Sequence, residues 1–143
     1  MEIIEAREVP LGGLRAMTVR RTLPARGRGL IGAWCFVDHF GPDDVTESGG
    51  MNVPPHPHTG LQTVSWLFSG TIEHTDSVGS RQLVGPGSLS LMTAGSGIAH
   101  AEVSVSGTPE TERVLHGVQL WVALPDAHRN TPPTYRHIVP TPV

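Results

Sequence analysis

Glycine and proline occur at short intervals along this chain, and their spacing limits the folds open to it. The sequence has 17 Gly and 13 Pro among 143 residues, spread along its length rather than gathered in one segment. Between them no helical period of 3.6 residues persists, whereas short β-prone runs recur. Turn signals at intervals of about 8–12 residues are typical of an all-β sandwich or barrel.

The predicted strands lie between these Gly- and Pro-containing turns. Residues 61–68, "LQTVSWLF", and 71–76, "TIEHTD", are joined at Ser69-Gly70 and predict a hairpin. The turn "GPG" at 85–87 predicts a second hairpin. The other predicted strands are residues 14–21, 32–40, 81–84, 88–93, 98–105 and 115–125.

The length suits one domain with a real core, which we expect over residues 1–130. The Pro-rich segment 131–143 predicts an extended tail, linker or edge segment. A net charge of −3 without a basic stripe argues against a direct nucleic-acid partner. The N-terminal sequence is not typical of a signal peptide and no run has membrane-spanning length, so we expect a cytoplasmic protein. The single cysteine, Cys35, agrees with a reducing compartment.

Two pairs of residues with i, i+2 spacing carry the chemistry of the sequence. His56 and His58 form the first pair, and His100 and Glu102 form the second. In an extended strand both members of such a pair face the same side. If the strands bring the pairs together inside a barrel, three imidazoles and one carboxylate converge. This donor set suits Fe(II), Mn, Ni, Cu or Zn and leaves coordination positions open for a substrate.

Four segments together resemble the pirin family of the cupin superfamily. They are "IGAWCFVDHFGP" (31–42), "HPHTGLQTVSWLFSG" (56–70), "LMTAGSGIAHAE" (91–102) and "LHGVQLWVALP" (115–125). The resemblance implies a cupin β-barrel, also called a jelly roll or double-stranded β-helix. Pirins bind one metal, usually iron, through three His and one Glu. By motif these ligands are His56, His58, His100 and Glu102, so the resemblance selects the same residues as the spacing.

The chain departs from the pattern in two ways. The general cupin motif has a glutamate four residues after the second histidine of the first pair, where this chain has Gln62. We expect Gln62 and Trp66 to share the parity of His56 and to line a substrate pocket. Pirins typically carry two cupin domains, and this sequence matches the N-terminal one.

The resemblance implies two main functions. Some pirins cleave flavonols such as quercetin with dioxygen, which predicts a quercetin 2,3-dioxygenase-like oxidoreductase in which Glu102 accepts the substrate proton. Other pirins bind transcription factors, which predicts a non-enzymatic, iron-dependent regulator. A third alternative is a half-barrel assembly module that binds metal only for stability. Fold alone does not separate these alternatives.

Three further expectations concern histidines outside the two i, i+2 pairs. We expect exposure for His74, with a place at the rim of the pocket as the alternative. We also expect a structural hydrogen bond for His39 and core packing for His116. A single barrel would leave unpaired strand edges and apolar strand surface exposed to water. Because proteins usually cover such surfaces, most often by a two-fold contact, we expect a homodimer. The alternative is that the Pro-rich tail folds back over the exposed edge.

Overall fold

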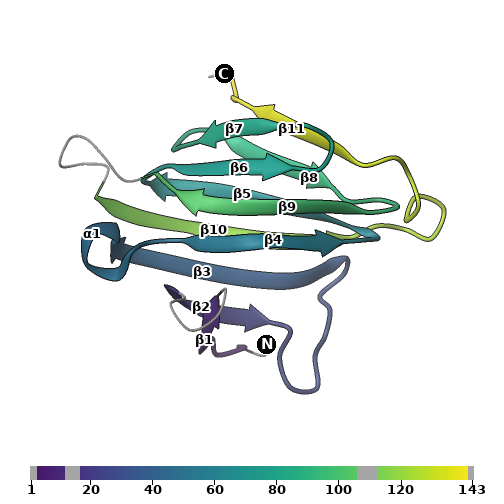
Figure 1. Ribbon diagram of the computed structural model, residues 1–143. Coiled ribbons are helices and arrows are strands. Elements are labelled where there is room, and N and C mark those ends of the chain that lie inside the picture. The colour runs from purple at the N-terminus through teal and green to yellow at the C-terminus, as the bar shows by residue number, and fades with distance from the viewer. Residues whose placement is uncertain (1–2, 12–16, 106–112, 142–143) are drawn as a thin grey trace.

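The computed structural model describes residues 3–11, 17–105 and 113–141, which form two stacked antiparallel sheets (Figure 1). The one helix of these described residues is α1 (Val45–Ser48). The strands are β1 (Arg7–Leu11), β2 (Met17–Leu23), β3 (Trp34–Asp44), β4 (Asn52–His58), β5 (Leu61–Ser69), β6 (Ile72–Asp76), β7 (Arg81–Val84), β8 (Leu89–Thr93), β9 (Ile98–Ser104), β10 (Val114–Ala123) and β11 (Thr134–Ile138). The prediction of an all-β sandwich or barrel is therefore confirmed.

The two sheets differ in size and exchange strands along the chain. The larger has seven strands in the order β1-β2-β3-β10-β5-β8-β11, and the smaller has four in the order β4-β9-β6-β7. Strands β1 and β11 form the two edges of the larger sheet, so the N-terminal and C-terminal segments lie at opposite sides of the molecule (Figure 1). The smaller sheet joins strands that are distant in sequence, and this pairing positions the histidine pairs.

The strands of both predicted hairpins are present, but neither hairpin forms. The turns at Ser69-Gly70 and 85–87 carry the chain from one sheet to the other, so β5 pairs with β8 in the larger sheet and β6 pairs with β7 in the smaller. Two boundaries also differ. Strand β3 continues past Gly41-Pro42, where the sequence predicted its end, because a β-bulge accommodates the turn residues opposite β10. Residues 14–16 of the predicted strand 14–21 lie outside the described residues, and the remainder falls in β2.

Apolar side chains fill one end of the space between the sheets. This cluster is built from alternate, inward-facing positions of its strands. Its buried members are Met17, Val19, Phe40, Val45, Met51, Val53, Leu67, Ile72, Val84 and Leu115. Beside it the buried carboxylate of Asp38 accepts two hydrogen bonds from the Arg21 guanidinium, at 2.7 and 2.8 Å. The charge in this part of the interior is therefore paired.

The Pro-rich C-terminal segment contributes a strand to the larger sheet. Strand β11 pairs antiparallel with β8, with Tyr135 opposite Met92. Tyr135 faces the interior, where its hydroxyl lies 3.1 Å from the Ser90 hydroxyl. The division into a domain over 1–130 and a tail over 131–143 stays a prediction, but part of this segment packs as an edge strand.

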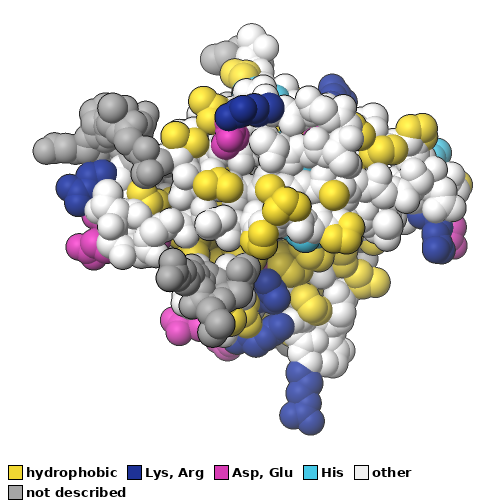
Figure 2. Space-filling view, in the orientation of Figure 1, with side chains coloured by type: hydrophobic (Ala, Val, Ile, Leu, Met, Phe, Trp, Pro, Cys, Tyr) yellow, Lys and Arg dark blue, Asp and Glu magenta, His cyan; other side chains and the backbone are white. Residues whose placement is uncertain are grey.

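The outer face of the four-stranded sheet carries scattered apolar side chains among polar ones (Figure 2). Leu83, Val103 and Val105 are among its exposed hydrophobic residues. Among the described residues, no helix has the length and apolar character needed to cross a membrane.

Gly117 tests the packing at the centre of the larger sheet. A methyl group at this position would lie 2.6 Å from the Phe40 ring and 2.8 Å from the Trp66 carbonyl oxygen. Because both neighbours are held in the sheet, we expect Gly117→Ala to lower the free energy of unfolding by about 1–3 kcal/mol. Urea denaturation followed by tryptophan fluorescence would measure the change.

Gly29→Ala is the matched control, because a methyl group there meets no atom within 4 Å. We expect the control to unfold at the wild-type urea concentration. Equal stability of both variants and the wild type would show that Phe40 does not pack tightly over Gly117.

Candidate metal centre

Strands β4 and β9 bring the two predicted pairs together. In the antiparallel register His56 lies opposite His100, and His58 lies opposite Ile98. A β-bulge between Val53 and His56 adds a residue to β4, which lets both histidines face the interior. The imidazole centroids of His56 and His100 are 4.5 Å apart, and those of His58 and His100 are 5.1 Å apart. One nitrogen from each of the three histidines lies within 4.8 Å of the others.

Two of the three imidazoles, those of His58 and His100, offer lone pairs rather than positive charges. Burial, followed by the neighbouring imidazoles, lowers the pKa of His58 to about 4 and that of His100 to about 3. The His56 Nδ1 lies 2.9 Å from the Pro54 carbonyl oxygen. A carbonyl only accepts hydrogen bonds, so Nδ1 carries a proton, and in the neutral tautomer Nε2 keeps the lone pair.

Two buried nitrogens in this cluster have no partner. Within the described residues, the Nε2 atoms of His58 and His100 make no hydrogen bond. A buried polar atom without a partner is costly, and such atoms in a native structure call for an explanation. A transition metal coordinated by the imidazoles would satisfy both nitrogens at once, so the donor set fits the metal that the family resemblance implies.

Glu102 lies in the same interior but belongs to a second, overlapping group. Its carboxylate accepts hydrogen bonds from the Gln119 amide at 2.8 and 3.1 Å and from the Ser65 hydroxyl at 3.5 Å. Burial raises the pKa of Glu102 above its usual range. Ligand atoms of Glu102, His74 and His100 lie within 4.8 Å of one another, so His100 is shared by both groups.

His74 is a site residue that the sequence analysis assigned wrongly. We expected it to be exposed, but only 2% of its surface is accessible to solvent. It lies opposite Glu102 in the pairing of β6 with β9 and therefore points into the interior. The sequence contains a pattern that indicates this inward orientation, because His74 and Asp76 form a third polar pair with i, i+2 spacing.

Asp76 holds His74 in place. The His74 Nε2 lies 2.9 Å from the Asp76 Oδ2, and the side chain of Asp76 is fully buried. Burial alone would raise the pKa of Asp76, but hydrogen bonds from His74 and Ser80 outweigh it and hold this pKa below its usual range. Asp76 is therefore an ionised carboxylate at neutral pH.

The structure corrects the face assigned to Gln62 and Trp66. Ser65 points toward Glu102, so the alternation of β5 places Gln62 and Trp66 on the opposite face. The Gln62 amide donates to the Thr93 hydroxyl at 2.9 Å instead. Side chains alternate between the two faces only along continuous extended backbone. The turn at Gly60, with φ of 68°, interrupts that backbone, so the face of Gln62 cannot be counted from His58. The amide that contacts the predicted ligand Glu102 is Gln119.

Aromatic rings border the histidines on two sides. Trp121 stacks on Phe36 with ring centroids 3.9 Å apart and presents its ring to His58 at 4.8 Å. On the other side Tyr135 stacks on His74 at 4.1 Å with an interplanar angle of 15°. These rings limit the orientations open to both imidazoles.

His39 and His116 form a separate pair outside this interior. Their Nε2 atoms are 2.8 Å apart, which confirms the structural hydrogen bond expected for His39. The expectation of core packing for His116 is wrong. It alternates with the buried Leu115 and Gly117 and contacts the exposed Phe68 ring on the outer face.

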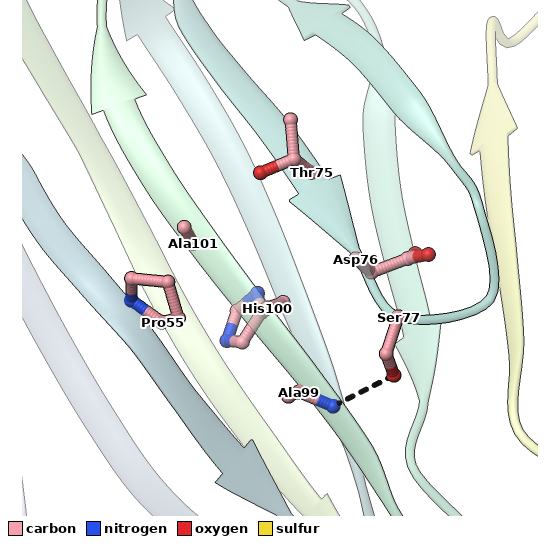
Figure 3. Close-up of a pocket in the computed structure, with 7 residues that line it drawn as sticks. All are labelled: Pro55, Thr75, Asp76, Ser77, Ala99, His100 and Ala101. Carbon is pink, nitrogen blue, oxygen red and sulfur yellow. Dashed lines mark hydrogen bonds between the residues drawn. The ribbon is translucent and has the colours of Figure 1, made fainter.

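A shallow cavity of about 260 Å³ lies over the outer face of the four-stranded sheet (Figure 3). Ala99 and Ala101 leave this hollow open because their side chains are only methyl groups. They alternate along β9 with the inward-facing His100 and Glu102. The lining residues are Pro55, Thr75, Asp76, Ser77, Ala99, His100 and Ala101.

Comparison with known proteins gives consistent matches. A Pseudomonas aeruginosa protein named provisionally as a quercetin 2,3-dioxygenase is 47% identical over 96% of this chain and 42% of its own length. A Caulobacter vibrioides pirin-like protein is 39% identical over 94% of this chain and 46% of its own. The crystal structure of a quercetin 2,3-dioxygenase from Acinetobacter baumannii is 46% identical, with a TM-score of 0.86 over 96% of this chain and 44% of that one.

The chain thus spans less than half the length of these relatives. The sequence profile of the pirin family matches residues 16–122, which include both histidine pairs and most of the two sheets. This chain belongs to the pirin family.

Proposed function

We propose that this chain is the metal-binding domain of a pirin-type oxidoreductase that acts on a flavonol such as quercetin. The observation that carries the proposal is the cluster of three imidazoles, two of which have a lowered pKa and, among the described residues, a buried Nε2 without a hydrogen-bond partner. The names of the Pseudomonas and Acinetobacter relatives support the substrate class. Because the chain spans under half of those proteins, the activity named for the whole relatives is a proposal for this chain.

We assign His56, His58, His100 and Glu102 as the metal ligands. The first three offer imidazole nitrogens, and Glu102 adds a carboxylate from the same strand as His100. This mixed set, without thiolates, favours Fe(II) over a structural zinc ion, which commonly has cysteine ligands. Mn, Ni, Cu and Zn are the alternatives. A bound Fe(II) ion would supply Lewis-acid and redox chemistry toward a flavonol and dioxygen.

Glu102 is the residue that we assign to proton transfer. Its buried carboxylate has a raised pKa, which makes it a better proton acceptor for a flavonol hydroxyl near neutral pH. Gln119 donates to both carboxylate oxygens and so holds the group in one orientation. Trp121 provides an apolar boundary beside His58 and keeps water away from that part of the site.

The metal assignment predicts that His100→Ala loses metal. His100 belongs to both groups of potential ligands, so its removal leaves neither group complete. We expect the metal content of the purified variant to fall at least about tenfold, measured by inductively coupled plasma mass spectrometry. His128→Ala, which changes an exposed histidine, should keep the wild-type content. Unchanged stoichiometry in His100→Ala would contradict the assignment.

The activity assignment predicts metal-dependent oxidation of quercetin. The iron-loaded protein should bleach quercetin in air and consume oxygen at the same rate. At matched metal occupancy, Glu102→Gln should lower kcat by about 10²-fold or more, because an amide cannot accept the proton. A loaded protein that neither bleaches quercetin nor consumes oxygen would overturn this assignment. It would favour the regulator that binds transcription-related partners.

Self-association as a homodimer stays a prediction. Strand β11 pairs with β8, as the alternative of a tail folded over the edge requires. The edges of both sheets remain available for pairing, although Pro54, Pro55 and Pro57 remove amide donors from β4. Light scattering at micromolar concentration should give a dimer mass, and a strict monomer would contradict it. A cytoplasmic location and the absence of a nucleic-acid partner also stay predictions.

A further inference from the structure

A line of hydrogen-bonding groups runs from Asp76 through His74 to His100. The His74 Nε2 lies 2.9 Å from the Asp76 Oδ2, and the His74 Nδ1 lies 3.4 Å from the His100 Nδ1. All three side chains are buried, with 2% or less of the Asp76 and His74 side chains exposed. The neighbouring strands β6 and β9 supply them, with Asp76 opposite His100.

The chemistry of the three groups sets the direction of these hydrogen bonds. A carboxylate only accepts, so the proton between Asp76 and His74 lies on the His74 Nε2. A neutral imidazole with its proton on Nε2 has a lone pair on Nδ1. The Nδ1 of a neutral His74 therefore accepts from the Nδ1–H of His100. With its proton on Nδ1, His100 keeps its lone pair on Nε2, the atom that lacks a protein partner.

Two further contacts hold the line in this arrangement. The second oxygen of Asp76, Oδ1, accepts from the backbone N–H groups of Val78 and Ser80, at 3.0 and 2.9 Å. These bonds fix which oxygen faces His74. Tyr135 stacks on the His74 ring at 4.1 Å, and its hydroxyl is bonded to Ser90, so the ring has little freedom to turn over.

We propose that Asp76 and His74 are positioning residues that fix the tautomer of His100 and present its Nε2 to the metal. Histidine ligands in metalloproteins commonly donate their second N–H to a carboxylate or carbonyl, which orients the ring and raises its basicity. Here a second histidine stands between the ligand and the carboxylate. The inference rests on the proposed function of His100 as a metal ligand.

The hydrogen bonds that link Asp76, His74 and His100 form a relay. Asp76→Asn tests this relay, because Asn has nearly the same shape as Asp. The Asn carbonyl oxygen can still accept from Val78 and Ser80, so the amide nitrogen faces His74. That nitrogen donates, which moves the His74 proton to Nδ1 and forces the His100 proton to Nε2. Long-range ¹H–¹⁵N NMR of histidine-labelled, metal-free protein should show His100 change from the Nδ1–H to the Nε2–H tautomer. The affinity for Fe(II), measured anaerobically by chelator competition, should fall by about tenfold to hundredfold.

Matched variants separate the relay from other effects. Asp126→Asn removes the same charge from a side chain that is 99% exposed and should bind Fe(II) like the wild type. His74→Phe keeps an aromatic ring against Tyr135 and leaves the Asp76 turn intact, but it removes the acceptor for His100. It should weaken Fe(II) binding by a similar factor. Adding Asp76→Asn to His74→Phe should then weaken binding no further, because the carboxylate acts through His74.

The outcomes distinguish the inference from the proposed function. A wild-type protein that binds no Fe(II) would overturn the proposed metal site itself. Tight binding by the wild type, together with equal binding and an unchanged His100 tautomer in Asp76→Asn, would overturn the relay alone. If Asp76→Asn fails to fold, as judged by circular dichroism, His74→Phe decides the question through its Fe(II) affinity.

Discussion

The alternation of side chains along two stacked sheets is the constraint on which this structure depends. Every second residue of a strand must enter the interior, so polar and apolar residues share one enclosed space. The chain separates them along the strands. On β6, Ile72 belongs to the apolar cluster and His74 to the histidine-rich region. The apolar end contributes the hydrophobic stabilisation, which allows the other end to hold buried groups that weaken folding when they are unpaired.

The polar region is arranged to favour a cation. The imidazoles of His58 and His100 are neutral because burial, followed by repulsion from the neighbouring histidines, lowers their pKa values. Two buried carboxylates lie on either side of His100, with Glu102 two residues away on β9 and Asp76 opposite on β6. Removing carboxylates from water is unfavourable unless charge or hydrogen bonds compensate. Among the described residues, the hydrogen bonds to Glu102 come from the neutral groups of Gln119 and Ser65, so a cation beside the carboxylate would add a compensating charge.

The sequence predicted those parts of the site that depend only on the alternation of side chains along a single strand. The pairs His56/His58 and His100/Glu102 share faces because both lie within uninterrupted extended backbone. Gln62 could not be placed from the same count, since Gly60 adopts a left-handed conformation between the pair and β5. Gln119 and Tyr135 reach the site through strand pairings that no local pattern encodes. For the fold, turn spacing was sufficient to predict an all-β architecture, but the order of strands in each sheet required the structure.

His100 stands where the two groups of potential ligands overlap, and the relay decides between them. A cation held by His74 would need a lone pair on one of that residue's nitrogens. Its Nε2 donates to Asp76, and its Nδ1 accepts from His100, so neither nitrogen is free while the relay is intact. The Nε2 of His100 remains available, as do the corresponding atoms of His56 and His58. In the proposed site the hydrogen bonds of His74 therefore leave the metal to His56, His58, His100 and Glu102. His74 orients His100 rather than binding the metal itself.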